Sequence, residues 1–167
     1  MTFWSGHPGV ALCIIEKLLN YSILVPSAVI HWALVAHAGA TRGAALSRAH
    51  VYELVFTTVI KVTNRVRQVV RKTDADAEVA AMRDLFRAMD DALGSWADGT
   101  KDEQAEMDVD DGEGRSEREA LVKRWGQQWL RVFRRRAAIE EAFLAEEAKE
   151  ARRLAAAAAA AEGAMES

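Results

Sequence analysis

The chain has 167 residues, with a formal net charge of −3, 50% hydrophobic residues and 28% charged residues. This length suits one domain that buries a core without cross-links, and the single cysteine, Cys13, excludes both a disulfide framework and a Cys/His zinc motif. Alanine is abundant, proline is scarce, and no segment alternates as a strand does, which indicates an all-α protein.

The first two predicted helices are short. Each of them, Pro8–Asn20 and Pro26–Gly39, starts with a proline near its first turn. The stretch Leu18–Thr41 has 24 residues without a charge, enough to span a bilayer, but a proline in its interior breaks the helix. We therefore favour two short core helices packed as an antiparallel pair, as in a solenoid unit, over a membrane span. Cys13 lies on an apolar face and is predicted to be an inert packing residue.

Three longer helices follow. The third is predicted from an N-cap at Ser47 to Arg71, with apolar residues three and four positions apart. A fourth helix, capped by Asp74 or Asp76, carries a heptad seam made of Val79, Met82, Phe86, Met89 and Leu93. The last helix starts near Ser116, and its seam, interrupted by Arg136, consists of Val122, Trp125, Trp129, Val132, Ile139 and Phe143. We expect these two seams to pack against each other.

Charge is distributed unevenly along the chain. Residues 98–119 contain ten acidic and three basic residues, a net charge of −7, which leaves +4 on the remainder. We predict a flexible acidic loop there. The domain organisation that follows is a helical core and first hairpin arm over 1–97, the acidic loop over 98–119, the second arm over 120–150, and an alanine-rich tail over 151–167 that forms a frayed helical extension.

Catalytic and metal-binding signatures are absent from the sequence. Part of the acidic loop has carboxylates at calcium-loop spacing, but the position that needs glycine is Asp111, so a solvated linker is the preferred interpretation. His31 and His37 are six residues apart and lie on different faces of one helix. No phosphate-binding glycine loop and no nucleophile motif occurs. We predict a non-enzymatic protein with no cofactor and no bound metal.

Positive charge is the remaining signal. Basic residues decorate the end of the third helix and much of the last one, where residues 120–139 contain no acidic side chain. Such a stripe can attract RNA phosphates or an acidic protein surface. The alternative is a solvated face, or arginines that pair with acidic residues of the chain itself. The candidate partner-facing or RNA-facing residues are Arg65, Arg67, Arg71, Arg131, Arg134 and Arg135.

Several blocks of the sequence form a distinctive series: Trp4, His7-Pro8, Leu18–Leu24, Ile30–Leu34, Val51–Val55, Lys61–Val70, Trp125, Gly126, Trp129 and Arg131–Arg135. In this order they resemble the last helical domain of the large subunit of the nuclear cap-binding complex, most closely its fungal form. The specificity of the likeness comes from several runs in the same order, and none of them is a catalytic signature.

The resemblance implies a HEAT-like helical repeat fragment related to the middle domain of initiation factor 4G, with a long antiparallel helical hairpin. It also implies a nuclear scaffold that holds a small RNA-recognition-motif subunit, which in turn binds the 7-methylguanosine cap and so supports mRNA splicing, export, nonsense-mediated decay and early translation. Capped RNA would be an indirect partner, with no membrane and no small-molecule substrate, in the nucleus and secondarily in the cytoplasm. No cap-contacting residue is carried over to this chain.

The family's large subunit is several times longer, so we expect this chain to correspond to a fragment, a truncated gene model or a decayed copy of its last domain. An incomplete repeat leaves an apolar face uncovered, and we expect helices Pro8–Asn20 and Pro26–Gly39 to expose one. The competing hypothesis is a self-associating coiled-coil protein unrelated to RNA, in which the two heptad seams pair between chains.

Overall fold

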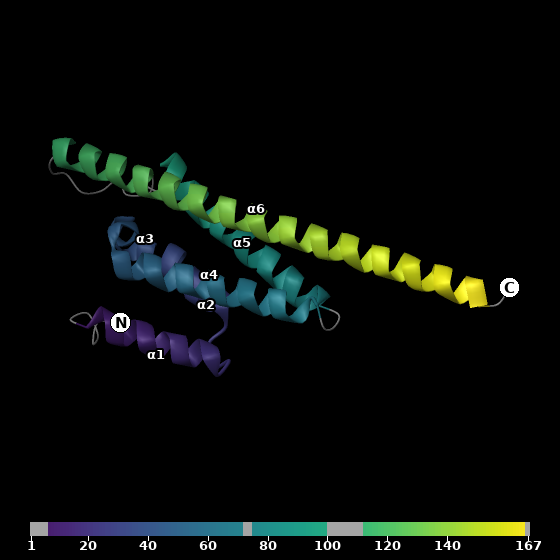
Figure 1. The fold of residues 1–167 in the computed structure, drawn as a ribbon. Coiled ribbons are helices and arrows are strands. Elements are labelled where there is room, and N and C mark those ends of the chain that lie inside the picture. Colours follow the sequence, from purple (N-terminus) through teal and green to yellow (C-terminus); the bar gives the residue numbers. More distant parts are fainter. Residues whose placement is uncertain (1–6, 72–74, 100–111, 166–167) are drawn as a thin grey trace.

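The computed structural model describes residues 7–71, 75–99 and 112–165, and every regular element in these ranges is helical (Figure 1). The all-α prediction is therefore confirmed. Each predicted helix has a counterpart in the structure. The elements are α1 (Pro8–Asn20), α2 (Pro26–His31), η2 (Trp32–His37), α3 (Ala38–Ala40), η3 (Ala44–Ser47), α4 (Ala49–Val69), α5 (Asp76–Asp98) and α6 (Gly112–Met165).

Helix α1 lies at the edge of the molecule (Figure 1). It begins at Pro8 as predicted, but it buries only Ala11 among its 13 residues. Its apolar side chains Val10 and Ile14 are exposed, and so is Cys13, which makes the prediction of a packing cysteine wrong. The reason is that a helix at the edge of a bundle has a neighbour on one side only, so most of its apolar surface stays in contact with water.

The second predicted helix is a continuous helical segment that changes its winding. It starts at Pro26 after an extended residue, and continues through the π-helix η2 and α3 to Ala40. In a π-helix residues five apart lie nearly above one another, and here Trp32 and His37 stack with ring centroids 4.8 Å apart. Ile30 and Leu34 of this segment are buried and Val35 is 37% exposed, so the expected apolar patch consists mainly of α1 and the turn that follows it, with Val35 contributed by the second helix.

Helix α4 starts one residue later than predicted. Its N-cap is Arg48 in an extended conformation, and no side chain caps it. Ser47 ends the short 3₁₀ helix η3 instead, where its hydroxyl donates a hydrogen bond to the carbonyl of Ala44 at 2.8 Å. The predicted cap at Ser47 is therefore wrong, because the serine satisfies the preceding turn and not the following helix.

Helices α5 and α6 form the predicted antiparallel hairpin (Figure 1). Ion pairs between Arg83 and Glu141 and between Arg134 and Asp90 fix its direction, since lower numbers on α5 meet higher numbers on α6. Asp76 is the first residue of α5, whose N-cap is Ala75, so a cap at Asp76 is wrong; the alternative, Asp74, lies outside the described residues.

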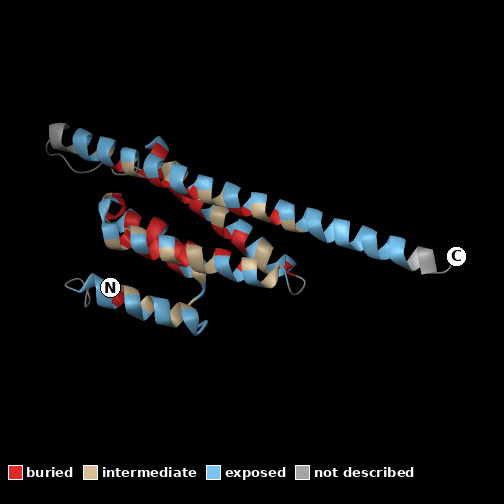
Figure 2. Ribbon diagram, in the orientation of Figure 1, coloured by how far each residue is buried: buried red, intermediate tan, exposed pale blue. Residues whose placement is uncertain are grey.

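Helix α6 is much longer than its partner. It starts at Gly112, inside the predicted acidic loop, of which residues 100–111 lie outside the described part of the chain. It runs without a break to Met165, and residues 148–161 are exposed throughout, in agreement with a helical alanine-rich extension (Figure 2).

The main core lies between α2–η2, α4, α5 and α6 (Figure 2), and a smaller buried cluster consists of Val66, Met82 and Leu144. Trp129 of α6 is the largest fully buried side chain of the main core, and its ring meets that of Tyr52 edge-on at 5.0 Å. Val132 and Ile139, which the sequence placed on this seam, are exposed, and Phe133 is buried in their place. No described helix has the length and hydropathy needed to cross a membrane.

Candidate functional site

The six arginines of the predicted stripe are divided between two helices. Arg65 and Arg67 lie on α4, Arg71 lies two residues beyond its last residue, and the other three lie on α6; the structure gives the six arginines two different environments. Within the described residues, Arg67, Arg71 and Arg134 form ion pairs with carboxylates of this chain. The stripe is therefore not a uniform cationic surface.

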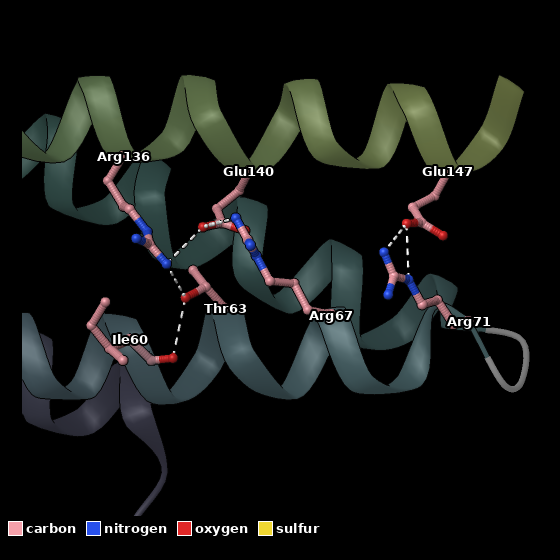
Figure 3. A network of polar contacts seen from close by, with 7 residues as sticks. All are labelled: Ile60, Thr63, Arg67, Arg71, Arg136, Glu140 and Glu147. Atoms are coloured by element: carbon pink, nitrogen blue, oxygen red, sulfur yellow. Dashed lines mark hydrogen bonds and ion pairs between the residues drawn. The ribbon is translucent and has the colours of Figure 1, made fainter. Parts of the chain in front are cut away.

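Arg67 belongs to a polar network buried between α4 and α6 (Figure 3). Its Nε lies 2.7 Å from Oε2 of Glu140, and its Nη2 donates to Oε1 of the same carboxylate at 3.1 Å. Arg136 approaches Glu140 from the α6 side at 2.8 Å and also donates to the Thr63 hydroxyl at 3.0 Å. Glu140 is only 1% exposed, so two guanidinium groups compensate one buried carboxylate.

Arg71, two residues beyond the last residue of α4, binds a carboxylate of α6 as Arg67 does. Its Nε and Nη2 both donate to Oε1 of Glu147, at 2.9 and 2.6 Å, and this hydrogen bonding raises the pKa of Arg71. The guanidinium groups of Arg67 and Arg71 also lie over the ring of Phe143, 4.7 and 5.5 Å from its centroid. Both arginines thus hold α4 against α6.

The pairs on the other side of α6 join the two arms of the hairpin. Arg134 donates to both oxygens of Asp90, at 2.5 and 2.9 Å, and this hydrogen bonding lowers the pKa of the carboxyl. Arg83 binds Glu141 in the same two-pronged way, with both distances 2.7 Å, and lowers the pKa of that carboxyl. Arg134 therefore has a structural role in the hairpin.

These two pairs predict a small acid-dependent loss of stability. The pKa values of Asp90 and Glu141 are lower in the folded state, so the unfolded chain binds more protons near pH 4 and acidification favours unfolding. Their side chains are 41% and 47% exposed, so each contributes no more than about 1 kcal/mol, present at neutral pH and lost as pH falls from about 5 to below 4. Urea midpoints at pH 7, 5 and 3.5 measure this loss, and Asp90→Asn with Glu141→Gln should reduce it.

Three stripe residues have no such partner. Arg65, Arg131 and Arg135 are exposed, and none of them forms an ion pair with another described residue. Arg131 and Arg135 are four residues apart and lie on the side of α6 that faces away from α5. Arg65, Arg131 and Arg135 are therefore the residues of the stripe that are available to another molecule.

The groove between α2–η2 and α5 has a mainly apolar lining. This groove of about 430 Å³ has an apolar floor that includes Ile30 and Leu85, with His31 and Asp84 among its lining residues. In the described ranges, no three His, Cys, Asp or Glu side chains gather as a metal site requires. The pocket lining contains one acidic and one imidazole group and no nucleophile beyond the hydroxyl of Ser27.

Sequence reasoning missed Glu140, the centre of the buried network. A signal for it was present: Phe133, Arg136, Glu140 and Phe143 are spaced three and four residues apart, so Glu140 falls on the seam. A charged residue at such a position, next to a seam arginine, indicates a buried ion pair.

The molecule thus consists of short helices packed against a long hairpin, with paired arginines along the seam of the hairpin. A family model described as MIF4G like matches residues 1–142. The chain belongs to the MIF4G-like family. No curated protein and no solved structure matches it. The match extends from the N-terminal residues through the hairpin and stops before the exposed part of α6. MIF4G-like domains are commonly found in RNA-related proteins and have a scaffold-type fold.

Proposed function

We propose that this chain is a non-catalytic scaffold of the nuclear cap-binding complex, which supports a small RNA-recognition-motif subunit as that subunit binds the 7-methylguanosine cap. The observation that carries the proposal is the MIF4G-like match over residues 1–142. It is supported by the ordered sequence blocks that resemble the last domain of the large subunit, such as Lys61–Val70 on α4.

The physical form of the molecule is compatible with this role. Its core brings the short α2–η2 segment, α4 and the hairpin into one body, α1 lies along the edge of that body against α4, and the far half of α6 extends from it with exposed side chains (Figure 2). Such a shape offers surface for contacts, and we place this scaffold in nuclear mRNA processing, export and decay.

The self-association hypothesis rested on heptad seams that pair between chains. In the structure the seam of α5 packs against that of α6 within one chain, for example where Met89, Leu93 and Phe133 join the core. These seams are therefore occupied, and self-association would need another surface.

Retention on 7-methylguanosine resin tests the proposed function. The purified chain is applied alone, with the cognate small cap-binding subunit, and with that subunit plus free cap analogue as competitor. We expect retention only with the small subunit, and release by the competitor. Retention on unmethylated guanosine resin is the matched control. If the chain stays in the flow-through while the small subunit is retained, this domain does not join the two and the proposal fails.

A further inference from the structure

One side of the contact between α4 and α6 exposes apolar side chains from both helices. Phe56 of α4 is 39% exposed, and Val132 and Ile139 of α6 are 36% and 46% exposed. Each belongs to a helix whose opposite side is buried in the core. Val132 and Ile139 were predicted to be buried on the seam of α6, and Phe56 follows the buried residue Val55 on α4.

Phe56 of α4 and Val132 of α6 lie at the same level of the two helices, and Ile139 lies further along, near the level of Arg67. Helices α4 and α6 run in the same direction here, because Tyr52 meets the ring of Trp129 while Thr63, further along α4, receives a hydrogen bond from Arg136. Phe56 and the half-buried Ile60 lie between Tyr52 and Thr63, and so are level with residues 129–136 of α6. Figure 3 shows Ile60 on α4 across from Arg136.

Two unpaired arginines border this apolar area. Val132, Arg135 and Ile139 are three and four residues apart and share one side of α6, and Arg131 lies one turn before Arg135. Both arginines are exposed and form no ion pair within the described part of the chain. We call this surface the α4–α6 outer face, and define it by Phe56, Ile60, Arg131, Val132, Arg135 and Ile139.

The other contacts of α6 within the chain show which side chains pack against a surface of this composition. Where α6 meets its neighbours, each contact has an apolar seam flanked by arginines, and every such arginine faces a carboxylate: Arg134 faces Asp90, and Arg67 faces Glu140. On α6 the outer face repeats the apolar residues and the arginines, and residues 131–139 of that helix contain no carboxylate; beside its α4 part lies the exposed Glu53, three residues before Phe56. Charge complementarity therefore calls for acidic groups from a partner.

We propose that the α4–α6 outer face binds an amphipathic segment of another protein, in which acidic residues flank an apolar stripe. Aliphatic side chains such as Val132 and Ile139 suit a peptide better than RNA, because bases need aromatic platforms. The aromatic ring of the outer face, that of Phe56, is already stacked on Tyr52, with ring centroids 5.9 Å apart. The proposal does not depend on a role in cap binding.

Peptide selection on the full-length chain tests the outer face. A random library of 16-residue peptides displayed on phage is selected on the wild-type chain, and enriched peptides are measured by fluorescence anisotropy. The variant R131E/R135E reverses the two charges. The control K17E/R152E makes the same change of net charge at exposed positions on α1 and on the far part of α6. Both variants should keep the circular dichroism of the wild type.

We expect the enriched peptides to combine apolar residues at helical spacing with a net negative charge. Their affinity should fall at least about tenfold for R131E/R135E and stay within about twofold for the control. Replacing the acidic residues of a peptide by lysine should restore binding to R131E/R135E. The proposal is overturned if no peptide binds saturably, if the enriched peptides are not acidic, or if both variants bind alike. Tighter binding of a 12-residue oligouridine, lost in R131E/R135E, would overturn it in favour of RNA.

Discussion

Glu140→Ala is expected to destabilise the fold by about 3–5 kcal/mol, a large part of the stability of a domain of this size. The carboxylate is 1% exposed and accepts hydrogen bonds or ion pairs from Arg67 and Arg136. Without it, two guanidinium groups face each other between α4 and α6 with no compensating charge. Chemical unfolding followed by helical circular dichroism measures the loss.

The neighbouring residue provides the matched control. Glu141 also pairs with an arginine, Arg83, but its side chain is 47% exposed, so Glu141→Ala should lose less than about 1 kcal/mol. Equal losses in the two variants would mean that burial of Glu140 is not what makes it important. A further variant, with Glu140, Arg67 and Arg136 replaced by leucine and methionines, should recover much of the stability, because an apolar cluster removes the desolvation penalty together with the charges.

The order and type of the helices could be predicted from the sequence because local signals agree with the fold. Prolines at positions 8 and 26 mark the starts of α1 and α2, and apolar residues three and four apart mark the buried faces of α4 and α5. The fold class needs little more than this periodicity. Family resemblance then added a function that periodicity alone does not carry.

The register of α6 could be predicted only in part from hydrophobicity: Val122, Trp125, Trp129 and Phe143 pack in the core as predicted, but the middle of the seam does not follow the apolar residues. The true seam passes through Gly126, Phe133, Arg136 and Glu140, so two charged residues and a glycine occupy positions where apolar residues were expected. A search for apolar residues therefore selected Val132 and Ile139, which lie beside the seam and are exposed. Tertiary contacts, and not local preference, decide which side of such a helix is buried.

The sequence also could not predict which arginines of the basic stripe pair with carboxylates of the chain. The sequence shows that Arg67 and Arg135 are both cationic residues on long helices, but a carboxylate partner 73 residues away is set by the packing of α4 on α6. The structure separates arginines that hold helices together from arginines that remain available. That distinction underlies the proposed outer face.

Glycine to alanine at position 126 is expected to destabilise the hairpin by about 1–3 kcal/mol, although alanine is the better helix former. A Cβ atom on Gly126 would stand 2.9 Å from the backbone nitrogen of Ala97 and 3.1 Å from the Trp96 backbone carbonyl carbon and Cβ. These are main-chain atoms and the root of a buried side chain, so they cannot move aside as a flexible side chain can. The two helices must separate where α5 ends, close to the indole of Trp96, whose Nε1 donates a hydrogen bond to the Leu34 carbonyl.

The same substitution at Gly94 is the control, because it changes the chain by the same methyl group within a helix. Nothing lies within 4 Å of a Cβ at Gly94, so Gly94→Ala should stabilise the protein by about 0.5–1 kcal/mol through helix propensity alone. Opposite signs in thermal and urea unfolding are therefore expected for the two variants. A stabilising Gly126→Ala would contradict the close approach of α5 and α6, while Gly126→Val should enlarge the loss, since its extra methyl groups enter the same contact.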